Sequence, residues 1–514
     1  MRAATFLFGA GVLLAQASQT AHAQPPPPIQ VIMDLHMDPL NGFPLSIRPT
    51  VYASWRDAAD WMMDLCDTYG AKITFLAVGE YMEYTLADTA SWPLMERLAA
   101  GGSFGTHSHQ EQKAGPHNWP NLPGNAPMSA IVDQWNDHVS AVDAVIAAAL
   151  GISDPNAIRA LNNVRGAHLP SRDAARLGLM ADFGFTMHQQ GPDETFYVYF
   201  KHYAMNPYRP SAAHFLSHDP DGPVVVSPFG PVLGRNEVHF GIQQDMRLPA
   251  MQTRWLMTLL NWLDDTIVTE TGRPWVYGWA EHGADIVPGQ VTRDVLPLQL
   301  AWLHENFVTH TVSGRSALAW SSAANSRDLY LDWETAHPGQ AAFSYPASET
   351  DWALYPYLLP VAWYLVDGQY QAAEVAGDVR LHRVTAAASI GGPYDLYVAY
   401  PGGNASVTED LSAVLGVGTI GAVDPRTGLA PLASATSVDV PLTGVLLVPA
   451  NKRLYLPNGD LNLDGVVDFS DINPFVSVLS GQDPDPDRRR AADINRDGVV
   501  DFADVNPFIA ALTG

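Results

Sequence analysis

The chain has 514 residues, and its 28 Lys and Arg against 54 Asp and Glu give a formal net charge of −26. This acidic balance argues against nucleic acid and anionic membranes as partners, because no basic field is present to hold phosphates. The length allows two domains and a smaller unit, and the single Cys66 excludes an intrachain disulfide, so the fold depends on buried apolar surface.

The first 23 residues have the pattern of a secretory signal peptide. Arg2 supplies the positive charge, an apolar stretch follows, and Ala21-His-Ala23 fits a small-x-small cleavage site. We expect a mature chain that begins at Gln24 and is secreted, either extracellular or associated with a cell surface. No later apolar run is long enough for a membrane span.

The next 300 residues alternate between strand and helix patterns, which predicts an α/β fold with a parallel sheet. A (β/α) barrel is the leading way to close that sheet, and an open doubly wound sheet is the rival. The predicted strands are Ile29–Asp38, Lys72–Val78, Ser103–His107, Asn163–His168, Phe185–Gln189, Pro223–Ser227, Trp275–Ala280 and Phe307–Val312. The predicted helices are Ser54–Tyr69, Trp92–Ala100, Met128–Leu150, Arg172–Phe183, Pro249–Thr271, Leu296–Asn306 and Ser313–Ala324.

Short β-rich runs separated by Gly, Pro and Asn follow, and they predict a small β-sandwich. The predicted division is therefore a signal peptide at 1–23, a barrel at 24–335, a β-sandwich module at 336–456 and a short α-helical calcium-loop domain at 457–514.

Ligand-type side chains stand at the ends of two predicted strands. Alternation puts Asp34, His36 and Asp38 on one face of the first strand, and Asp38 at the strand end is the better placed ligand. The third strand ends in His107-Ser-His109, whose two imidazoles share one face about 6–7 Å apart. Two histidines and a carboxylate suit zinc or another divalent transition metal.

The surrounding motifs resemble those of the polysaccharide deacetylase family, the NodB-homology barrel, over roughly Ile29 to Ala324. The matching segments are Thr74-Phe-Leu-Ala-Val-Gly79, Phe104-Gly-Thr-His-Ser-His109, Arg165-Gly-Ala-His168-Leu-Pro170 and the late His282. The resemblance implies hydrolysis of acetyl amide or ester groups on a polysaccharide, with a divalent metal in the barrel.

The resemblance also implies roles for individual residues. Asp38 and His107 would be metal ligands, His282 would protonate the leaving group, and Arg165 would orient the catalytic carboxylate. The family's adjacent aspartates are not adjacent here, so Asp34 is the nearest candidate base. The family's second metal histidine would fall four residues after His107, where this chain has a glutamate, so the remaining ligand is either His109 or Glu111.

The last 55 residues hold two copies of one acidic loop, and each copy is followed by one short helix. Oxygen donors fall at loop positions 1, 3, 5, 9 and 12, position 7 adds a backbone carbonyl, and Gly stands at position 6, which is the ligand spacing of a calcium loop. The pattern predicts two calcium ions. Their expected ligands are Asp460, Asn462, Asp464, Val466, Asp468 and Asp471 in the first loop, and Asp493, Asn495, Asp497, Val499, Asp501 and Asp504 in the second.

This duplicated loop and helix resembles a dockerin domain, over Gly459 to Gly514, although no helix is predicted before the first loop. Position 12 is Asp rather than Glu, and the shorter side chain reaches less far toward a bound ion. The resemblance implies a cohesin module as partner, and dockerins are usually attached to enzymes that act on polysaccharides.

Two other functions remain open at this stage. A glycoside hydrolase on a (β/α) barrel would need two carboxylates at strand ends, for which Asp38, Glu281 and Asp285 are candidates. A non-catalytic surface protein, in which a degenerate barrel binds glycan, is the other alternative.

Overall fold

A computed structural model provides the fold. It describes residues 27–101, 103–109, 111–166, 187–188, 206–211, 218–227, 259, 262, 272–309, 311–312, 315–340, 369–386, 394–402, 406–415, 420–424, 428–431, 436–441, 444–449, 459–462, 467–495 and 499–513. The expected signal peptide at 1–23 lies outside these residues, as do the predicted helix Arg172–Phe183 and nearly all of the predicted helix Pro249–Thr271.

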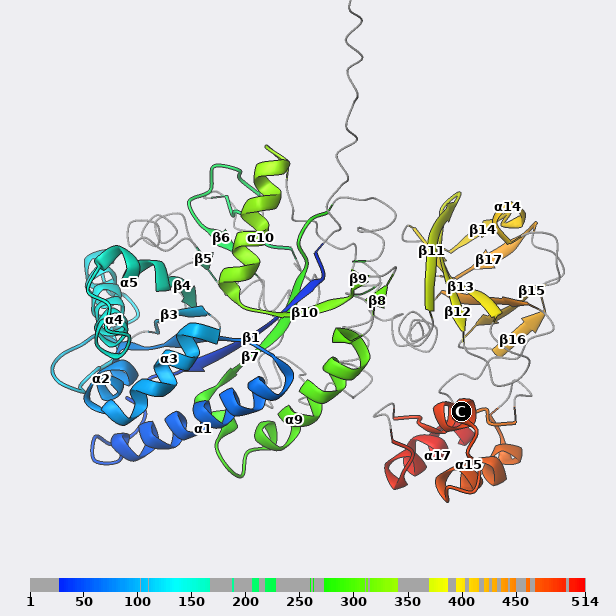
Figure 1. The fold of residues 1–514 in the computed structure, drawn as a ribbon, viewed down its shortest axis with the longest axis horizontal. Coiled ribbons are helices and arrows are strands. Elements are labelled where there is room, and N and C mark those ends of the chain that lie inside the picture. Colours follow the sequence, from blue (N-terminus) through cyan, green and yellow to red (C-terminus); the bar gives the residue numbers. More distant parts are fainter. Residues whose placement is uncertain are drawn as a thin grey trace, which may run out of the picture.

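The N-terminal unit is built on one parallel sheet with β1 (Ile29–Met37) at its centre, drawn in blue in Figure 1. One edge of β1 pairs with β7 (Val276–His282). The other edge pairs with β2 (Ile73–Ala77) near its end and with β10 (Leu318–Ser321) near its start. Beyond β2 the sheet continues through β3 (Ser103–His107), β4 (Asn162–Gly166), β5 (Met187–His188) and β6 (Val225–Val226). This parallel α/β sheet confirms the predicted fold class.

Closure of the sheet into a barrel stays a prediction. The pairings among the described residues run from β7 and β10 through β1 to β6, and they include none that joins β6 back to β7 or β10. The helices of this unit are α1 (Arg48–Tyr69), α2 (Gly79–Ala87), α3 (Trp92–Gly101), α4 (Met128–Ala149), α5 (Pro155–Leu161), α9 (Val291–Leu303) and α10 (Ala323–Ala336), with 3-10 turns at Thr89–Ser91 and Gly283–Ile286.

Burial explains why β1 is central. All nine of its residues are buried, and alternate side chains face opposite sides of the sheet. Met33, Leu35 and Met37 belong to the main apolar core together with Trp55 and Met62 of α1, so α1 covers that face. Asp34 and His36 consequently point to the other face of the sheet.

Of the two elements predicted at 307–324, the strand is confirmed only at Thr311–Val312 and the helix is wrong. A π-helical turn, η5 (His304–Val308), replaces the start of the strand, and β8 (Thr311–Val312) forms a small antiparallel hairpin with β9 (Arg315–Ser316). In the described part of the predicted helix Ser313–Ala324, residues 315–324, the chain instead forms β9, β10 and the first two residues of α10. The reason is tertiary, because Leu318 is buried in the core and β10 completes the edge of β1. The helix begins only after Ser322, whose hydroxyl accepts the Asn325 amide N–H.

The second unit is an antiparallel β structure. Six strands lie in the order β11 (Gln369–Ala376), β12 (Val379–Ala386), β13 (Tyr394–Pro401), β18 (Val445–Pro449), β15 (Ile420–Asp424) and β16 (Gly428–Pro431). A separate pair joins β14 (Val407–Glu409) to β17 (Val438–Val440), beside the short helix α14 (Ser412–Leu415). One apolar cluster unites β12, β13 and β18 with β17, which is what a two-layer β module requires, while the sandwich assignment itself stays a prediction.

The C-terminal unit repeats one motif twice. The first copy ends in η6 (Phe469–Asp471) and α15 (Ile472–Leu479), and the second in η7 (Phe502–Asp504) and α17 (Val505–Thr513). A further helix, α16 (Pro486–Ala492), enters the second loop and was not predicted. The copies meet through Phe475 and Phe508, whose rings stack with centroids 4.1 Å apart.

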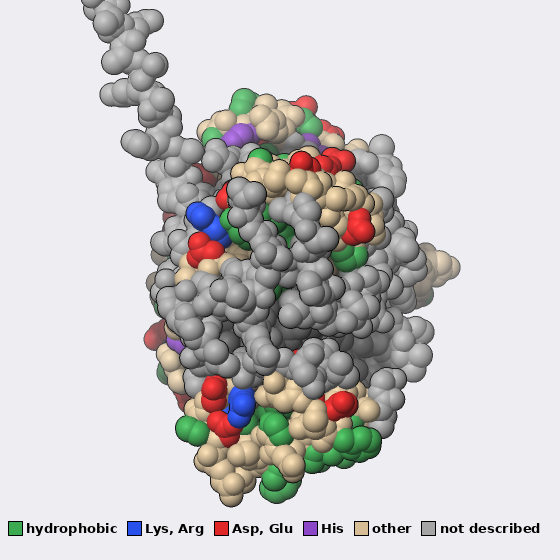
Figure 2. Space-filling view, turned by 90° about the vertical axis from the view of Figure 1, so that its right-hand side faces the viewer, with side chains coloured by type: hydrophobic (Ala, Val, Ile, Leu, Met, Phe, Trp, Pro, Cys, Tyr) green, Lys and Arg blue, Asp and Glu red, His purple; other side chains and the backbone are tan. Residues whose placement is uncertain are grey.

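The apolar side chains of α15 and α17, and of the turns that precede them, are only partly buried. Phe469 is 80% exposed and Phe502 is 85% exposed, because each lies in the turn just before its helix. Figure 2 shows apolar side chains next to carboxylates at the lower end of the molecule, where this unit lies. Within the described parts of the chain, no helix is long and apolar enough to cross a membrane.

Candidate functional site

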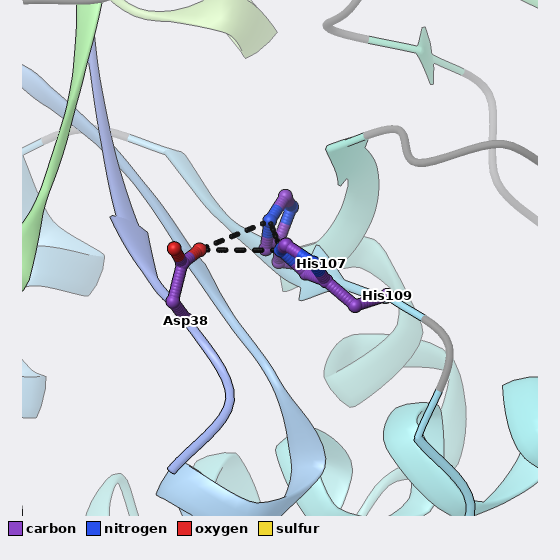
Figure 3. Close-up of side chains that lie close together, drawn as sticks. All are labelled: Asp38, His107 and His109. Carbon is purple, nitrogen blue, oxygen red and sulfur yellow. Dashed lines mark hydrogen bonds and ion pairs between the residues drawn. The ribbon is translucent and has the colours of Figure 1, made fainter. Parts of the chain in front are cut away.

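Three of the predicted ligands converge at the ends of β1 and β3. His107 closes β3 and His109 follows it, and their Nε2 atoms lie 2.7 Å apart. Asp38 follows β1, and its Oδ1 lies 3.2 Å from His109 Nε2 and 3.6 Å from His107 Nε2. Figure 3 shows the aspartate from one strand end facing both imidazoles from the other. The three side chains form the one cluster of potential metal ligands found among the described residues.

The charge states of this cluster follow from its surroundings. Burial alone would raise the pKa of Asp38, but the nearby His282 and the contacts with His107 and His109 outweigh it and hold that pKa well below its usual range. Burial lowers the pKa of His107 well below 6.5, and the neighbouring His36 and His109 lower it further. The buried pair is therefore a carboxylate beside a neutral imidazole.

The cluster fits a divalent transition metal. Two imidazole nitrogens and one carboxylate oxygen lie within 4.8 Å of one another, and a metal ligand set needs neutral histidines and an ionised carboxylate. Two nitrogens and one oxygen are also the donor set that leaves a fourth position open on zinc.

Glu111, the alternative ligand, lies elsewhere. Its carboxyl group is fully buried, with Oε1 3.5 Å from His138 Nε2 on α4. The His138 Nδ1 accepts the Gly79 amide N–H at 2.8 Å, so the proton sits on Nε2, which donates to the Glu111 carbonyl at 3.0 Å. His138 thereby ties Glu111 to α4, and the second histidine of the cluster is His109.

His282 faces Asp38 from the end of β7, with Asp285 behind it. His282 ends β7, and its Nε2 lies 3.7 Å from Asp38 Oδ2. Its Nδ1 contacts Asp285 Oδ2 at 3.0 Å, an interaction within one 3-10 turn. Sequence reasoning did not assign this role to Asp285, although the His-x-x-Asp spacing directly after a strand was available as a signal. The contact fixes the orientation of the imidazole.

His36 lies between the two groups. Its ring centroid is 4.4 Å from that of His107 and 5.5 Å from that of His282. The register explains this, because His36 on β1 is level with His282 on β7. Four imidazoles and two carboxylates therefore share this end of the sheet.

The structure gives only the strand positions of two predicted catalytic residues, Asp34 and Arg165, relative to the cluster. Asp34 is fully buried, level with Thr74 on β2 and four residues before Asp38, which is about 13 Å along an extended strand. Arg165 lies on β4 in register with Thr106, next to the histidine-bearing end of β3, and its side chain is outside the described residues. Their roles as base and orienting arginine stay predictions.

Glu281 lies on the face of β7 opposite to His282. Its register partner on β1 is Leu35, which packs under α1, whereas the partner of His282 is His36. Burial raises the pKa of Glu281 well above its usual value, and the nearby charges of Asp34 and Asp285 raise it further. Glu281 therefore does not share the face of Asp38, as a carboxylate pair for glycoside hydrolysis would require.

The two C-terminal loops are held by the carboxylate at position 12. Asp471 is fully buried, and its Oδ1 accepts the amide N–H of Leu461 at 2.8 Å and of Asn462 at 2.9 Å. Asp504 is equally buried and accepts the Asn495 amide N–H at 3.0 Å. The expected ligands Asp464, Val466 and Asp497 lie outside the described residues.

The dockerin resemblance is confirmed by comparison with known families. Residues 458–513 match the dockerin type I domain, so this C-terminal unit is a dockerin domain. Dockerin domains bind cohesins, and their loops bind calcium. No curated protein matches the chain.

Solved structures similar to the chain include two described as polysaccharide deacetylases. One, from Mycobacterium smegmatis, is 12% identical, with a TM-score of 0.35 over 60% of this chain and 96% of that one. The other, from Pseudomonas aeruginosa PAO1, is 13% identical, with a TM-score of 0.36 over 61% and 93%. A 4-alpha-glucanotransferase from Thermococcus litoralis is 11% identical, with a TM-score of 0.38 over 64% and 43%. All three TM-scores lie below 0.5, so the function proposed below rests on the side chains of the site.

Proposed function

We propose that the chain is a secreted, metal-dependent carbohydrate deacetylase, which hydrolyses acetyl amide or ester groups on a polysaccharide. The observation that carries the proposal is the convergence of Asp38, His107 and His109, with the His282–Asp285 pair facing the same carboxylate. A glycoside hydrolase is less well supported, because Glu281 lies on the other face of β7 and Asp285, the remaining candidate partner of Asp38, is paired with His282.

The residues of the site would have separate roles in metal binding and proton transfer. Asp38, His107 and His109 would hold the divalent metal, which supplies polarisation of an acetyl carbonyl and a more acidic water. His282 lies near the other carboxylate oxygen of Asp38 and would protonate the leaving group, with Asp285 holding its ring in place. Asp34 and Arg165 are carried in this proposal as the base and its orienting arginine, on the motif resemblance alone.

The C-terminal domain would attach this activity to other proteins. We propose that its two loops each bind one calcium ion and that the folded domain binds a cohesin-type module. Without cations the loop carboxylates repel one another, so a chelator is expected to lower the thermal stability of residues 459–514. An unchanged circular dichroism spectrum and melting temperature in chelator would exclude this calcium role.

The catalytic proposal is tested by acetate release. Full-length protein, loaded with zinc, is assayed on N-acetylated chitin oligomers and O-acetylated xylan beside the His107→Ala and Asp38→Asn variants. The account predicts acetate release by the parent protein and loss of release in both variants. Cleavage of glycosidic bonds without acetate release, and without dependence on metal, would support the hydrolase alternative instead.

A further inference from the structure

Two of the three proposed metal ligands, Asp38 and His109, lie on separate chain segments that leave the sheet at different strands, while His107 is the last residue of β3. Asp38 begins the segment 38–47, between β1 and α1, and His109 begins the segment 109–121, after β3. The described residues of these segments, 38–47, 109 and 111–121, form no helix and no named strand, so the strand pairings of the sheet do not by themselves fix the distance between the two segments. A preformed site needs side chains that hold these two segments together.

One buried ion pair contacts both segments. Arg48, the first residue of α1, and Glu80 of α2 lie 2.6 Å apart, with side-chain exposures of 9% and 0%. The other carboxylate oxygen of Glu80 accepts the Leu40 amide N–H at 3.1 Å, two residues after Asp38.

The guanidinium group extends the link to the second segment. Arg48 donates to the Phe43 carbonyl at 2.8 Å and to the Asn41 carbonyl at 3.4 Å, both on the first segment. The same side chain donates to the His117 carbonyl at 3.3 Å, on the second segment. The planar, multidentate arginine fork suits this arrangement, and a lysine could not reproduce it.

Further contacts join the second segment to the first segment and to α2. Asn41 donates directly across to the Trp119 carbonyl at 3.1 Å. On α2, Glu83 accepts the His117 amide N–H at 2.8 Å and the Trp119 indole N–H at 3.0 Å. A Cβ on Gly79 would lie 2.3 Å from the Trp119 ring, so the glycine permits this close packing.

We propose that Arg48 and Glu80 are positioning residues, which hold the two ligand-bearing segments at the separation that metal binding needs. This inference rests on the proposed function, because it assumes that Asp38, His107 and His109 bind a metal. Neither residue touches the metal or substrate, so their effect is on affinity and ligand geometry. Loss of partners behind the metal ligands typically lowers metal affinity by about 10–100-fold.

The test uses full-length protein with excess calcium to fill the C-terminal loops. Co²⁺ is titrated against a competing chelator, and its visible absorption reports the ligand geometry. Glu80→Gln and Arg48→Met remove the ion pair, and Arg48→Lys keeps the charge while it loses the carbonyl contacts. The matched control is Arg56→Met, because the Arg56–Asp88 pair also joins α1 to the end of α2, at 2.6 Å, and contacts neither segment.

We expect Glu80→Gln and Arg48→Met to bind Co²⁺ about 10–100-fold more weakly with an altered spectrum, Arg48→Lys to fall between, and Arg56→Met to stay within about twofold of the parent. Parent affinity in folded Arg48→Lys and Glu80→Gln would overturn the positioning role and leave the proposed function intact. An equal loss in Arg56→Met would also overturn it. A parent protein that binds no more Co²⁺ than His107→Ala would overturn both proposals.

Discussion

The buried His138 is the residue for which the structure gives the sharpest stability prediction. It sits on α4 with no exposed surface, and it bridges the Gly79 amide N–H and the Glu111 carbonyl at 2.8 and 3.0 Å. His138→Leu keeps much of the volume and removes both hydrogen bonds. The change would leave one buried donor and one buried acceptor without their partner.

The expected loss of unfolding free energy follows from the Gly79 amide N–H and the Glu111 carbonyl. A buried polar group that loses its partner costs about 1–3 kcal/mol, so His138→Leu should lower the free energy of unfolding by about 2–6 kcal/mol. His138→Asn retains an acceptor near Gly79, and His138→Gln retains a donor near Glu111, so each should cost about half as much. The loss of unfolding free energy in His138→Leu should therefore be close to the sum of the losses in His138→Asn and His138→Gln.

The assay is urea unfolding of the full chain followed by tryptophan fluorescence. Twelve of the 14 tryptophans lie between Trp55 and Trp333 in the N-terminal unit, the other two lie in the segment 336–456, and the dockerin domain has none. The signal therefore reports mainly the N-terminal unit. A loss below about 0.5 kcal/mol in His138→Leu, within the range of ordinary surface substitutions, would refute the bridging role.

Three further predictions concern the site and the buried Glu281 beside it. His109→Ala should weaken zinc binding by more than 100-fold, whereas Glu111→Gln should retain it within about tenfold, and equilibrium dialysis would distinguish them. Asp285→Asn should lower kcat for acetate release by at least tenfold with little change in KM, because it releases the His282 ring; equal effects on both constants would contradict this. Burial raises the pKa of Glu281 in the folded protein, so its contribution to stability is fully present at acidic pH and is lost as the pH rises through the raised pKa. Glu281→Gln should abolish this loss. Melting temperatures of the parent and the variant from pH 4 to 9 would test it.

The sequence was sufficient for the parts of the site that depend on local order. Asp38 and His107 stand at the ends of parallel strands, and such ends gather at one edge of the sheet, so their meeting was predictable. Which of His109 and Glu111 joins the cluster was not predictable, because it depends on the contact between Glu111 and the buried His138 of α4. Asp285 is an intermediate case. Its spacing from His282 is visible in the sequence, but only the 3-10 turn shows that the two side chains are in contact.

The fold shows the same division between local and tertiary information. The strands at β1, β2 and β3 were predicted nearly to their ends, because apolar runs and flanking turns mark them. The segment Leu318–Ser321 was predicted as helix and is strand β10, since its pairing with β1 outweighs its local pattern. The dockerin domain was recognised from its duplicated loop and helix, whereas the exposure of Phe469 and Phe502 depends on the 3-10 turns that precede the two helices.

The most direct test of the central claim is the transition-metal content of the purified full-length chain, measured by mass spectrometry with calcium in excess, beside His107→Ala. The account predicts about one zinc or similar ion per parent chain and its loss in the variant. No transition metal in either protein after reconstitution with zinc would contradict the deacetylase proposal.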